Sequence, residues 1–383
     1  MELYVHFPFC RQKCNYCDFV SFPGMEGEME HYLNTVVHEA ELTAGDITEP
    51  VTTVYFGGGT PSLIPENLMR DFLRSLRETL PLDGVSEWTT EANPGTLTRS
   101  WLDMAREGGI NRLSLGMQAA QPGLLKMLGR IHSMEEVEKS VKEARSAGFD
   151  NVNLDLIFGL PGQTPEDWKE TIYSAFDLAP EHISAYGLIP EEGTPLWNCL
   201  QSGLLQLPES DAERDMYDCF LRESQKHGYV QYEISNFARP GYACLHNIGY
   251  WNQTPYLGLG VSAASLIHMT PEDGGVTYLR RTESLSMKEY FAGIQDENPR
   301  WSEYTRISPA EARFETMMLG LRMNRGVRED EFYRLHGKTV ETCYGEKLAV
   351  LEKDGLIYHQ NGSWYLTRMG MDLQNYVLTE LMD

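Results

Sequence analysis

The sequence predicts an α/β fold in which six consecutive strand–helix units form a partial, open barrel, followed by a mainly helical domain. Short apolar strands alternate with amphipathic helices through the first 190 residues. This alternation is typical of a parallel sheet with right-handed crossovers and helices that cover it. The pattern changes after Pro190, before the eight units of a closed barrel. A partial (β/α)6 barrel therefore fits the sequence better than a closed one.

The individual elements follow from the spacing of apolar residues. Strands are predicted at residues 2–7, 52–59, 86–94, 111–118, 151–162 and 182–190. Apolar residues recur every three or four positions between them, which predicts helices. These helices are expected at residues 29–43, 65–80, 100–109, 133–148 and 165–179, with a short helical piece before residue 133. Pro65 in a first turn and Gly148 at an end are common helix boundaries.

We divide the chain into a barrel core at residues 1–190, a barrel extension at 191–304 and a C-terminal domain at 305–383. The extension is less regular and includes a helix, a strand-like stretch and a glycine-rich segment. The C-terminal domain has three predicted helices and then a hairpin with Asn-Gly at its tip, an order typical of a winged helix. Residues 301–383 carry 13 acidic against 10 basic side chains, so the charge pattern of a DNA binder is missing.

Composition excludes several protein classes. Of the 383 residues, 32 are basic and 56 acidic, which gives a formal charge of -24 and opposes general attraction to nucleic acid or anionic lipid. No apolar run is long enough for a membrane span, and the opening residues lack the pattern of a secretory signal. We therefore expect a cytoplasmic protein, with peripheral membrane contact left open. Its seven cysteines, an odd number, are expected to be reduced.

Polar residues follow several predicted strands at their carboxyl ends, where ligands bind in parallel α/β folds. They include the cysteine group after the first strand, glycines after the second and single polar residues after later strands. Core packing does not require such residues at equivalent ends of different strands. We therefore expect a shared ligand site formed by Cys10, Cys14, Cys17, Gly57, Gly58, Gly59, Thr60, Glu91, Asn93, Gln118, Asp155 and the segment 186–190.

The cysteines have a spacing that favours an iron–sulfur cluster. Cys10, Cys14 and Cys17 are separated by three and then two residues. Thiolates select zinc or iron–sulfur clusters. A structural zinc needs a fourth ligand, which His6 could supply only by reaching back across Pro8. A [4Fe–4S] cube held by three cysteines instead leaves one iron open to an external ligand.

The other strand-end residues have weaker signals, and each has a plainer interpretation. Three glycines at 57–59 suit either a tight turn or close backbone approach to a ligand. Glu91 could bind a ribose or an ammonium group, or could be a solvated charge. Gln118 and Asp155 lie in apolar strands, so they need partners from a ligand or an internal network. Arg130 could clamp a carboxylate or be an ordinary surface arginine.

Taken together, the motifs resemble the radical S-adenosylmethionine superfamily. The cysteine motif "HFPFCRQKCNYCDF" and "VYFGGGTPSLIP" carry this resemblance. Nearly the whole chain resembles oxygen-independent coproporphyrinogen III oxidase and the related HemW-type haem chaperones, through blocks such as "TTEANPGTL", "NLDLIFGLPGQT", "AYGLIPEEGTPL" and "LGLGVSAAS". The resemblance implies a partial radical-SAM barrel, a [4Fe–4S] cluster and S-adenosylmethionine.

The resemblance also implies roles for individual residues. Cys10, Cys14 and Cys17 would ligate the cluster, and Tyr16 would pack beside it. Tyr4, Gly58 and Glu91 match nucleoside-binding positions. A second S-adenosylmethionine, or part of the substrate region, would lie near Gly59, Thr60, Gln118, Arg130 and Asp155. Ile189 and Ala264 match backbone or apolar contacts by spacing.

Three features favour the chaperones over the oxidase. The oxidase has a further cysteine after the third, where this chain has Phe19, and it has an N-terminal extension, whereas this sequence starts on the first strand. "HNIGYW" resembles the HNxxYW signature of the chaperones, which makes His246, Tyr250 and Trp251 candidates for binding haem. Imidazole is a common axial haem ligand, but His246 could equally be a hydrogen-bonded core histidine. Cys244 is expected to be a small buried hydrophobe.

The leading hypothesis is a haem chaperone that binds haem, the cluster and S-adenosylmethionine and passes haem to acceptor proteins. Its expected partners are haem, haem-accepting proteins and an electron donor such as flavodoxin or ferredoxin. The alternative is an oxygen-independent coproporphyrinogen III oxidase, which decarboxylates coproporphyrinogen III to protoporphyrinogen IX. A third possibility is a zinc-stabilised binding module.

Overall fold

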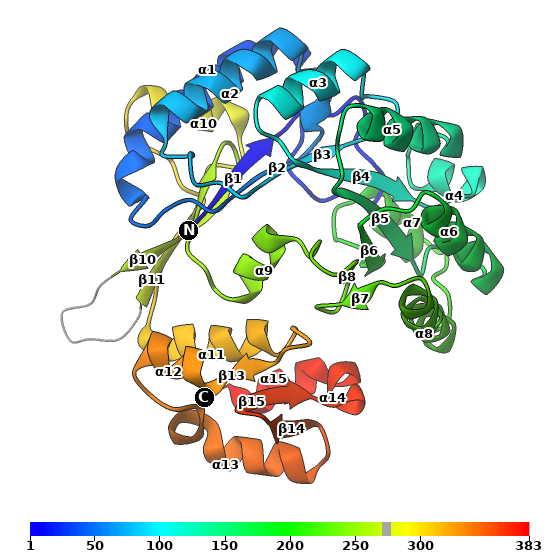
Figure 1. Ribbon diagram of the computed structural model, residues 1–383, viewed down its shortest axis with the longest axis vertical. Helices are drawn as coiled ribbons and strands as arrows, with labels where there is room; N and C mark the ends of the chain where they lie inside the picture. Colours follow the sequence, from blue (N-terminus) through cyan, green and yellow to red (C-terminus); the bar gives the residue numbers. More distant parts are fainter. Residues whose placement is uncertain (270–276, 383) are drawn as a thin grey trace.

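A computed structural model describes residues 1–269 and 277–382 of the protein. One twelve-stranded sheet dominates it, in the order β12-β11-β10-β9-β1-β2-β3-β4-β5-β6-β8-β7 (Figure 1). The sheet curves around an open side, and its two edge strands do not pair with each other. The partial α/β barrel predicted from the sequence is therefore the observed architecture.

The six predicted strands lie side by side and run parallel. They are β1 (Glu2–Phe7), β2 (Thr53–Gly58), β3 (Glu87–Ala92), β4 (Arg112–Gln118), β5 (Val152–Phe158) and β6 (His182–Gly187). A further strand, β9 (Tyr256–Leu259), pairs parallel to the free edge of β1. The sequence did not predict this strand, which places β1 inside the sheet rather than at its edge.

Antiparallel strands extend both edges. Beyond β9 lie β10 (Ala264–Met269), β11 (Thr277–Thr282) and β12 (Glu303–Ile307). Beyond β6 lie β8 (Asn236–Ala238) and β7 (Val230–Gln231). The strand-like stretch 229–238 is thus two short strands separated by a break. Since β8 pairs with β6 and β12 spans residue 304, the sheet crosses both predicted domain boundaries, whose positions stay predictions.

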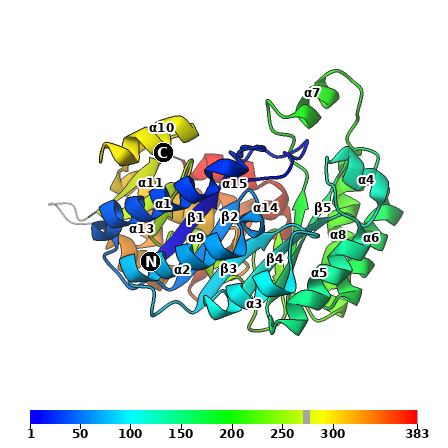
Figure 2. The same cartoon turned by 90° about the horizontal axis from the view of Figure 1, so that it is seen from above.

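Helices cover the convex face of the sheet. They are α1 (Met29–Thr43), α2 (Glu66–Thr79), α3 (Arg99–Glu107), α4 (Pro122–Met127), α5 (Met134–Ser146), α6 (Pro165–Asp177), α8 (Ser210–Lys226) and α10 (Met287–Gln295). Several start where a side chain satisfies the first free N–H groups, as Ser133 and Thr164 do through capping boxes. Figure 2 shows α7 (Pro195–Gln201) standing apart from this row of helices.

The two faces of the parallel sheet differ in polarity, as β1 illustrates. Leu3, Val5 and Phe7 belong to the hydrophobic core beneath the helices. The alternate residues Glu2, Tyr4 and His6 point to the opposite, concave face, because successive side chains of a strand alternate. The other strands repeat this pattern, so the concave face carries Thr53, Tyr55, Glu87, Glu91, Arg112, Ser114, Asn153, Asp155, His182 and Ser184. The barrel therefore has a polar interior.

The C-terminal domain has its own hydrophobic core, which includes Leu321, Phe332 and Leu348. Its elements are α11 (Pro309–Gly320), β13 (Val327–Arg328), α12 (Glu329–His336), α13 (Val340–Lys353), the hairpin β14 (Ile357–Gln360) and β15 (Ser363–Leu366), α14 (Arg368–Asp372) and α15 (Gln374–Leu381). Asn361 and Gly362 form the predicted hairpin tip, both with positive φ. The final two helices were not predicted.

Helix α9 (Leu245–Trp251) lies between the concave face of the sheet and the C-terminal domain (Figure 1). It packs against β2 on one side and α11 on the other. This helix, which contains the HNIGYW motif, was not predicted from the sequence. Among the helices of the described residues, none has the length and apolar character needed to cross a membrane.

Candidate cofactor site at the strand ends

The loop after β1 carries the three cysteines and is fixed through Asn15. Its main-chain N–H donates to the carbonyl of Leu128 (2.9 Å), and its side-chain amide donates to that of Met127 (2.8 Å). The Asn15 carbonyl accepts from Leu196 N–H in α7 (2.9 Å). These bonds hold the loop against the end of α4 on one side and α7 on the other.

A chain of polar side chains connects two of the thiols. Cys10 Sγ lies 3.6 Å from Thr60 Oγ1, which accepts a hydrogen bond from Asn93 Nδ2 (2.8 Å). Asn93 Oδ1 accepts from Arg130 Nη2 (2.8 Å), and Arg130 Nη1 lies 3.6 Å from Cys14 Sγ. Residues from four strand ends or loops are thereby held in fixed positions around the cysteines.

The three cysteines border a cavity of about 480 Å³ at the carboxyl ends of the strands. This volume lies within the usual range for small-molecule sites. Most residues predicted for the site line this one cavity. They are Cys10, Cys14, Tyr16, Cys17, Gly58, Gly59, Thr60, Glu91, Gln118, Arg130, Asp155 and Ile189. Residues that are far apart in the sequence are therefore brought together as the strand-end argument predicted.

Two of the glycines are required by their surroundings. Gly58 has a φ of +98°, and a Cβ atom there would lie 2.3 Å from the His6 ring. A Cβ atom at Gly59 would lie 2.5 Å from the carbonyl oxygen of Phe7. Both positions therefore need glycine because the backbone packs closely against the first strand and the residue that follows it, and approach of this motif to a ligand stays a prediction.

Among the carboxylates that border the cavity, Glu91 has the pKa that is shifted most. Its Oε1 accepts from Tyr55 O–H (2.9 Å) and its Oε2 from Gly58 N–H (3.1 Å). Burial, together with the smaller effect of the nearby Asp155 carboxylate, raises the pKa of Glu91 to about 7, although the two hydrogen bonds oppose this rise. The carboxyl group is consequently poised to ionise close to neutral pH.

Asp155 has the internal partners expected for a polar group in an apolar strand, and Gln118 has an unusual backbone conformation. Gln118 has a φ of +64° beside a bulge in the β4–β5 pairing, a conformation that a non-glycine residue adopts at some cost. Asp155 accepts from Ser114 O–H (2.8 Å) and from the amide of Asn153 (2.9 Å). Asn153 Oδ1 in turn lies 2.6 Å from Nδ1 of the buried His182. This network holds the Asp155 carboxylate at the cavity wall.

The thiols are partly shielded from water. Burial raises the pKa of Cys10, and it raises the pKa of Cys17 to about 11. Within the described residues, no group of three His, Cys, Asp or Glu side chains is arranged to hold a single metal ion. The His6 ring, considered as a fourth zinc ligand, has both nitrogens in hydrogen-bond range of protein atoms, Tyr4 O–H at 3.0 Å and the carbonyl of Val20 at 2.8 Å.

Comparison with known proteins decides the family. Residues 4–174 match the Radical SAM superfamily, and residues 307–373 match the HemN C-terminal domain. The "Heme chaperone HemW" of Bacillus subtilis is 35% identical over 377 residues, which span 98% of this chain and 97% of that protein. The chain belongs to the HemW family of the radical SAM superfamily.

A HemW relative from Escherichia coli is 33% identical over 384 residues and covers 99% of this chain and 97% of its own. The solved structure of the radical SAM enzyme coproporphyrinogen III oxidase (HemN) from Escherichia coli has a TM-score of 0.83. It matches 100% of this chain and 89% of its own at 23% sequence identity. At this identity the likeness shows the fold alone.

In this HemW-family chain, two residues predicted to contact the nucleoside or its surroundings lie outside the cavity lining. Tyr4 is on the concave face of β1, where its hydroxyl meets His6 Nδ1 (3.0 Å) and its ring stacks on Tyr55 at 6.3 Å. Ala264 starts β10, and its carbonyl lies against Gly258 of β9. Neither residue is among those that border the cavity.

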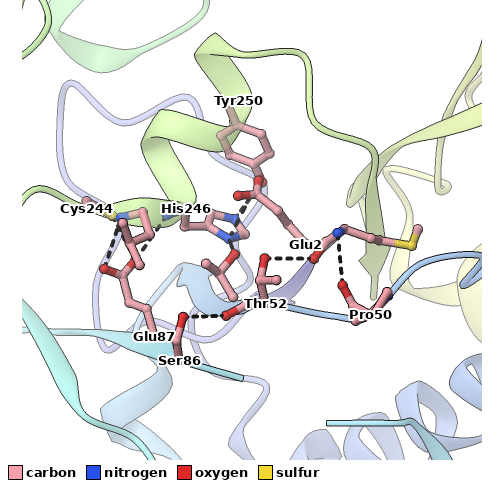
Figure 3. A network of polar contacts seen from close by, with 11 residues as sticks. Glu2, Pro50, Thr52, Ser86, Glu87, Cys244, His246 and Tyr250 are labelled. Atoms are coloured by element: carbon pink, nitrogen blue, oxygen red, sulfur yellow. Dashed lines mark hydrogen bonds and ion pairs between the residues drawn. The ribbon is translucent and has the colours of Figure 1, made fainter. Parts of the chain in front are cut away.

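The candidate haem-binding residues His246, Tyr250 and Trp251 also lie outside the cavity, on helix α9, where Figure 3 shows His246 and Tyr250. His246 is 1% exposed, with Nδ1 2.8 Å from Thr53 Oγ1 and Nε2 3.0 Å from the Tyr250 hydroxyl. Burial lowers the pKa of His246 to about 3. The ring is thus held as a neutral, hydrogen-bonded core histidine, and its role as a haem ligand stays a prediction. Trp251 lies under the guanidinium of Arg322, at 4.8 Å.

Other carboxylates surround this motif. Glu87 accepts from the main-chain N–H groups of Leu245 (3.0 Å) and His246 (3.1 Å), and the Cys244 thiol lies 3.4 Å from it. Cys244 is buried, as predicted. Glu2 approaches the His246 ring to 4.0 Å, but burial raises the pKa of Glu2 to about 9. Both partners are therefore uncharged near pH 7, and their contact is not an ion pair.

Some residues of this site were not predicted from the sequence. Tyr55 and Ser114 line the cavity from β2 and β4, but neither was singled out. A signal existed, because Tyr55 alternates with Thr53 and Gly57 along its strand and so shares their face. Asn93 was noted only as a strand-end residue, whereas it connects Thr60 with Arg130.

Proposed function

We propose that this protein is a haem chaperone that holds a [4Fe–4S] cluster and S-adenosylmethionine and transfers haem to acceptor proteins. The single observation that carries the proposal is the cavity bordered by three cysteines, in a chain similar over its full length to proteins described as heme chaperones. We propose that it acts in the cytoplasm.

The residues around the cysteines fit such a cluster. Cys10, Cys14 and Cys17 are free thiols on one loop that opens to one cavity. A cube binds each cysteine to a different iron, so it does not need the close donor group that a single zinc ion requires. When bound, the cluster supplies one-electron reduction. Arg130 places positive charge beside Cys14, with Nη1 3.6 Å from Sγ.

The cavity next to the thiols fits S-adenosylmethionine. Gly58 and Gly59 border the cavity, where their backbone would face the ligand, and Glu91 would accept hydrogen bonds from a ribose or an ammonium group. Gln118, Arg130 and Asp155 would border a second S-adenosylmethionine or part of the substrate region. The lining side chains orient the ligand and exclude water, while the cofactor supplies the chemistry.

Haem would be the cargo of this protein. The predicted contacts through His246, Tyr250 and Trp251 require helix α9 to open, because the imidazole is buried and both its nitrogens are engaged. The rim of the cavity is different, since Phe19 is 58% exposed and Ile189 is 71% exposed. Exposed apolar side chains beside a pocket suit the face of a porphyrin.

The partners follow from this chemistry. Cluster reduction needs a one-electron donor, for which we propose a flavodoxin or a ferredoxin. The net charge of -24 argues against nucleic acid as a partner. Phe19, at the place of the oxidase's further cysteine in the resemblance above, supports a chaperone over a decarboxylase.

The test uses protein purified and reconstituted without oxygen. We expect iron and sulfide in a ratio that corresponds to one cluster, a Soret band when haem is added, and transfer of that haem to an apo-haem protein. Cys14→Ser should lose the iron, whereas Cys343→Ser, in α13, should keep it. Conversion of coproporphyrinogen III would establish the oxidase instead. Zinc without iron would rule out both radical SAM interpretations.

A further inference from the structure

Two aromatic rings connect helix α9 to the carboxylate of Glu91. The His246 ring stacks on the Tyr55 ring, with centroids 5.1 Å apart and planes inclined by 27°. The Tyr55 hydroxyl donates to Glu91 Oε1 at 2.9 Å. Glu91 borders the cavity, and His246 does not. The histidine therefore reaches the cavity only through the tyrosine.

We infer that His246 is a positioning residue of the S-adenosylmethionine site, because it holds the Tyr55 hydroxyl against the Glu91 carboxylate. This inference rests on the function proposed above, in which Glu91 binds the nucleoside or its ammonium group. It gives the HNxxYW histidine a role that needs no free ring nitrogen, in contrast to iron ligation.

The His246 ring is well suited to act as a fixed wall. The Tyr250 hydroxyl engages one ring nitrogen (Figure 3) and Thr53 engages the other, so the ring cannot rotate without losing a buried hydrogen bond. The main-chain N–H of His246 is bound by Glu87 at 3.1 Å, which fixes the start of the helix as well. Contacts from two strands thus determine where the imidazole face lies.

The space between Tyr55 and Glu91 is kept clear by a glycine. A Cβ atom at Gly57 would lie 2.9 Å from the Tyr55 ring and 3.1 Å from the Glu91 carboxyl carbon. Both side chains therefore fill the volume that a larger residue at position 57 would occupy. His246 packs against the Tyr55 ring, and the absence of a side chain at Gly57 leaves room for the Tyr55 hydroxyl to reach the carboxylate.

The Tyr55 hydrogen bond also affects the ionisation of Glu91. It favours the carboxylate form and so lowers the pKa of Glu91, against the larger effect of burial. The other titratable or charged groups that face this carboxylate are Tyr4 of β1, Arg112 of β4, Asp155 of β5 and Tyr186 of β6. Removing the Tyr55 hydroxyl leaves all of these in place. Ligand binding by the Glu91 carboxylate should then require a higher pH.

The experiment measures the Kd of S-adenosylmethionine for the reconstituted, unreduced protein between pH 6 and pH 9 by calorimetry. For Tyr55→Phe, we expect binding about tenfold weaker at pH 7, from one lost hydrogen bond to a charged group. The pH at which binding reaches half its maximal strength should rise by about one unit. Tyr173→Phe, on the outer helix α6, is the matched control and should behave as wild type.

Two variants of His246 separate positioning from haem ligation. His246→Ala removes the stacking surface and should weaken S-adenosylmethionine binding in the same direction as Tyr55→Phe. His246→Phe keeps an aromatic face but has no nitrogen for iron, and it should restore binding to within about threefold of wild type. The Soret band of added haem should remain in both variants, and urea unfolding checks that each is folded.

The outcomes distinguish this inference from the proposed function. If the wild-type protein with its cluster fails to bind S-adenosylmethionine, the proposed function is wrong and the inference falls with it. If the wild type binds but Tyr55→Phe has an unshifted pH profile, the inference alone is overturned. Loss of the Soret band in both His246 variants, with normal S-adenosylmethionine binding, would also overturn it and identify His246 as a haem ligand.

Discussion

Replacing His246 with asparagine removes a buried titratable group and keeps one short polar side chain next to Thr53. The folded protein holds this imidazole neutral, because burial and the positive charge of Arg112 lower its pKa to about 3 from an ordinary 6.5. The unfolded chain takes up a proton as the pH falls below 6.5, whereas the folded chain does not. Stability contributed at neutral pH is therefore lost as the pH falls from 6.5 towards 3.

The size of this effect follows from the two pKa values. Between pH 7.5 and pH 5, His246 alone should lower the free energy of unfolding by about 2 kcal/mol. At pH 7.5 the loss of the ring contacts should make His246→Asn less stable than wild type by about 2 kcal/mol. The variant lacks the pH-dependent loss, so the difference between the two proteins should nearly vanish at pH 5.

Urea unfolding followed by fluorescence at pH 7.5, 6.5, 5.5 and 5 measures this difference. Taking the wild type minus the variant cancels the other groups that titrate over the same range. His38→Asn, at a histidine whose side chain is 41% exposed, is the control and should give no pH-dependent difference of this size. A constant difference for His246→Asn across the series would refute the reasoning, since it would mean that the folded protein protonates His246 as readily as the unfolded chain.

Three further changes have expected outcomes. Cys14→Ser should abolish the visible absorbance of the reconstituted cluster. The urea midpoint of the protein without cluster should change very little, because the thiol is half-buried at a loop. Gly59→Ala should lower the free energy of unfolding by about 1–3 kcal/mol, because its Cβ would overlap a backbone carbonyl, whereas Gly27→Ala meets no atom within 4 Å and should be neutral. In Glu39, burial raises the carboxyl pKa above its ordinary 4.5, so stability is lost as the pH rises above that value, by up to about 1.4 kcal/mol per unit; Glu39→Gln should flatten this slope in urea titrations at pH 6 and pH 8.

Much of the barrel and its site could be predicted because the signals are short-range. Each parallel strand is a compact apolar run followed by a helix, and the ends of parallel strands necessarily share one edge of the sheet. Their positions at strand ends are enough to predict that Cys10, Glu91 and Asp155 share one site, and all three border the cavity. The spacing of the three cysteines could be read directly from the sequence, so the iron–sulfur prediction did not depend on the fold.

The polar lining was harder to predict, because charged residues that alternate with apolar ones in a strand usually face water. Glu87 and Arg112 show this pattern, yet they are buried, with Arg112 1% exposed. Their burial depends on a cover for the concave face, and α9 forms part of it. The start of that helix is held by Glu87, which lies 158 positions away from Leu245 in the chain. No short stretch of sequence contains both Glu87 and the helix start that it binds.

His246 illustrates the same limit for a functional motif. The letters HNIGYW place an imidazole near two aromatic residues, which is equally suitable for iron ligation and for a packed core. The partners that fill both ring nitrogens come from β2 and from one turn further along α9. Only the fold reveals that the ring faces Tyr55 rather than the cavity.

The pairing of β1 has a consequence for how this protein is made. β1 lies between β2 and β9, and about 200 residues separate the end of β2 from the start of β9. At a translation rate of about 5–20 residues per second, one side of β1 lacks its strand partner for about 10–40 s after β2 has emerged. The strand that carries the cysteine loop is thus synthesised first, but it gains its second strand partner only late in synthesis. Pairing on both sides of β1 has to wait for residues 256–259, and a ribosome stalled before that point leaves an open strand edge next to three unprotected thiols.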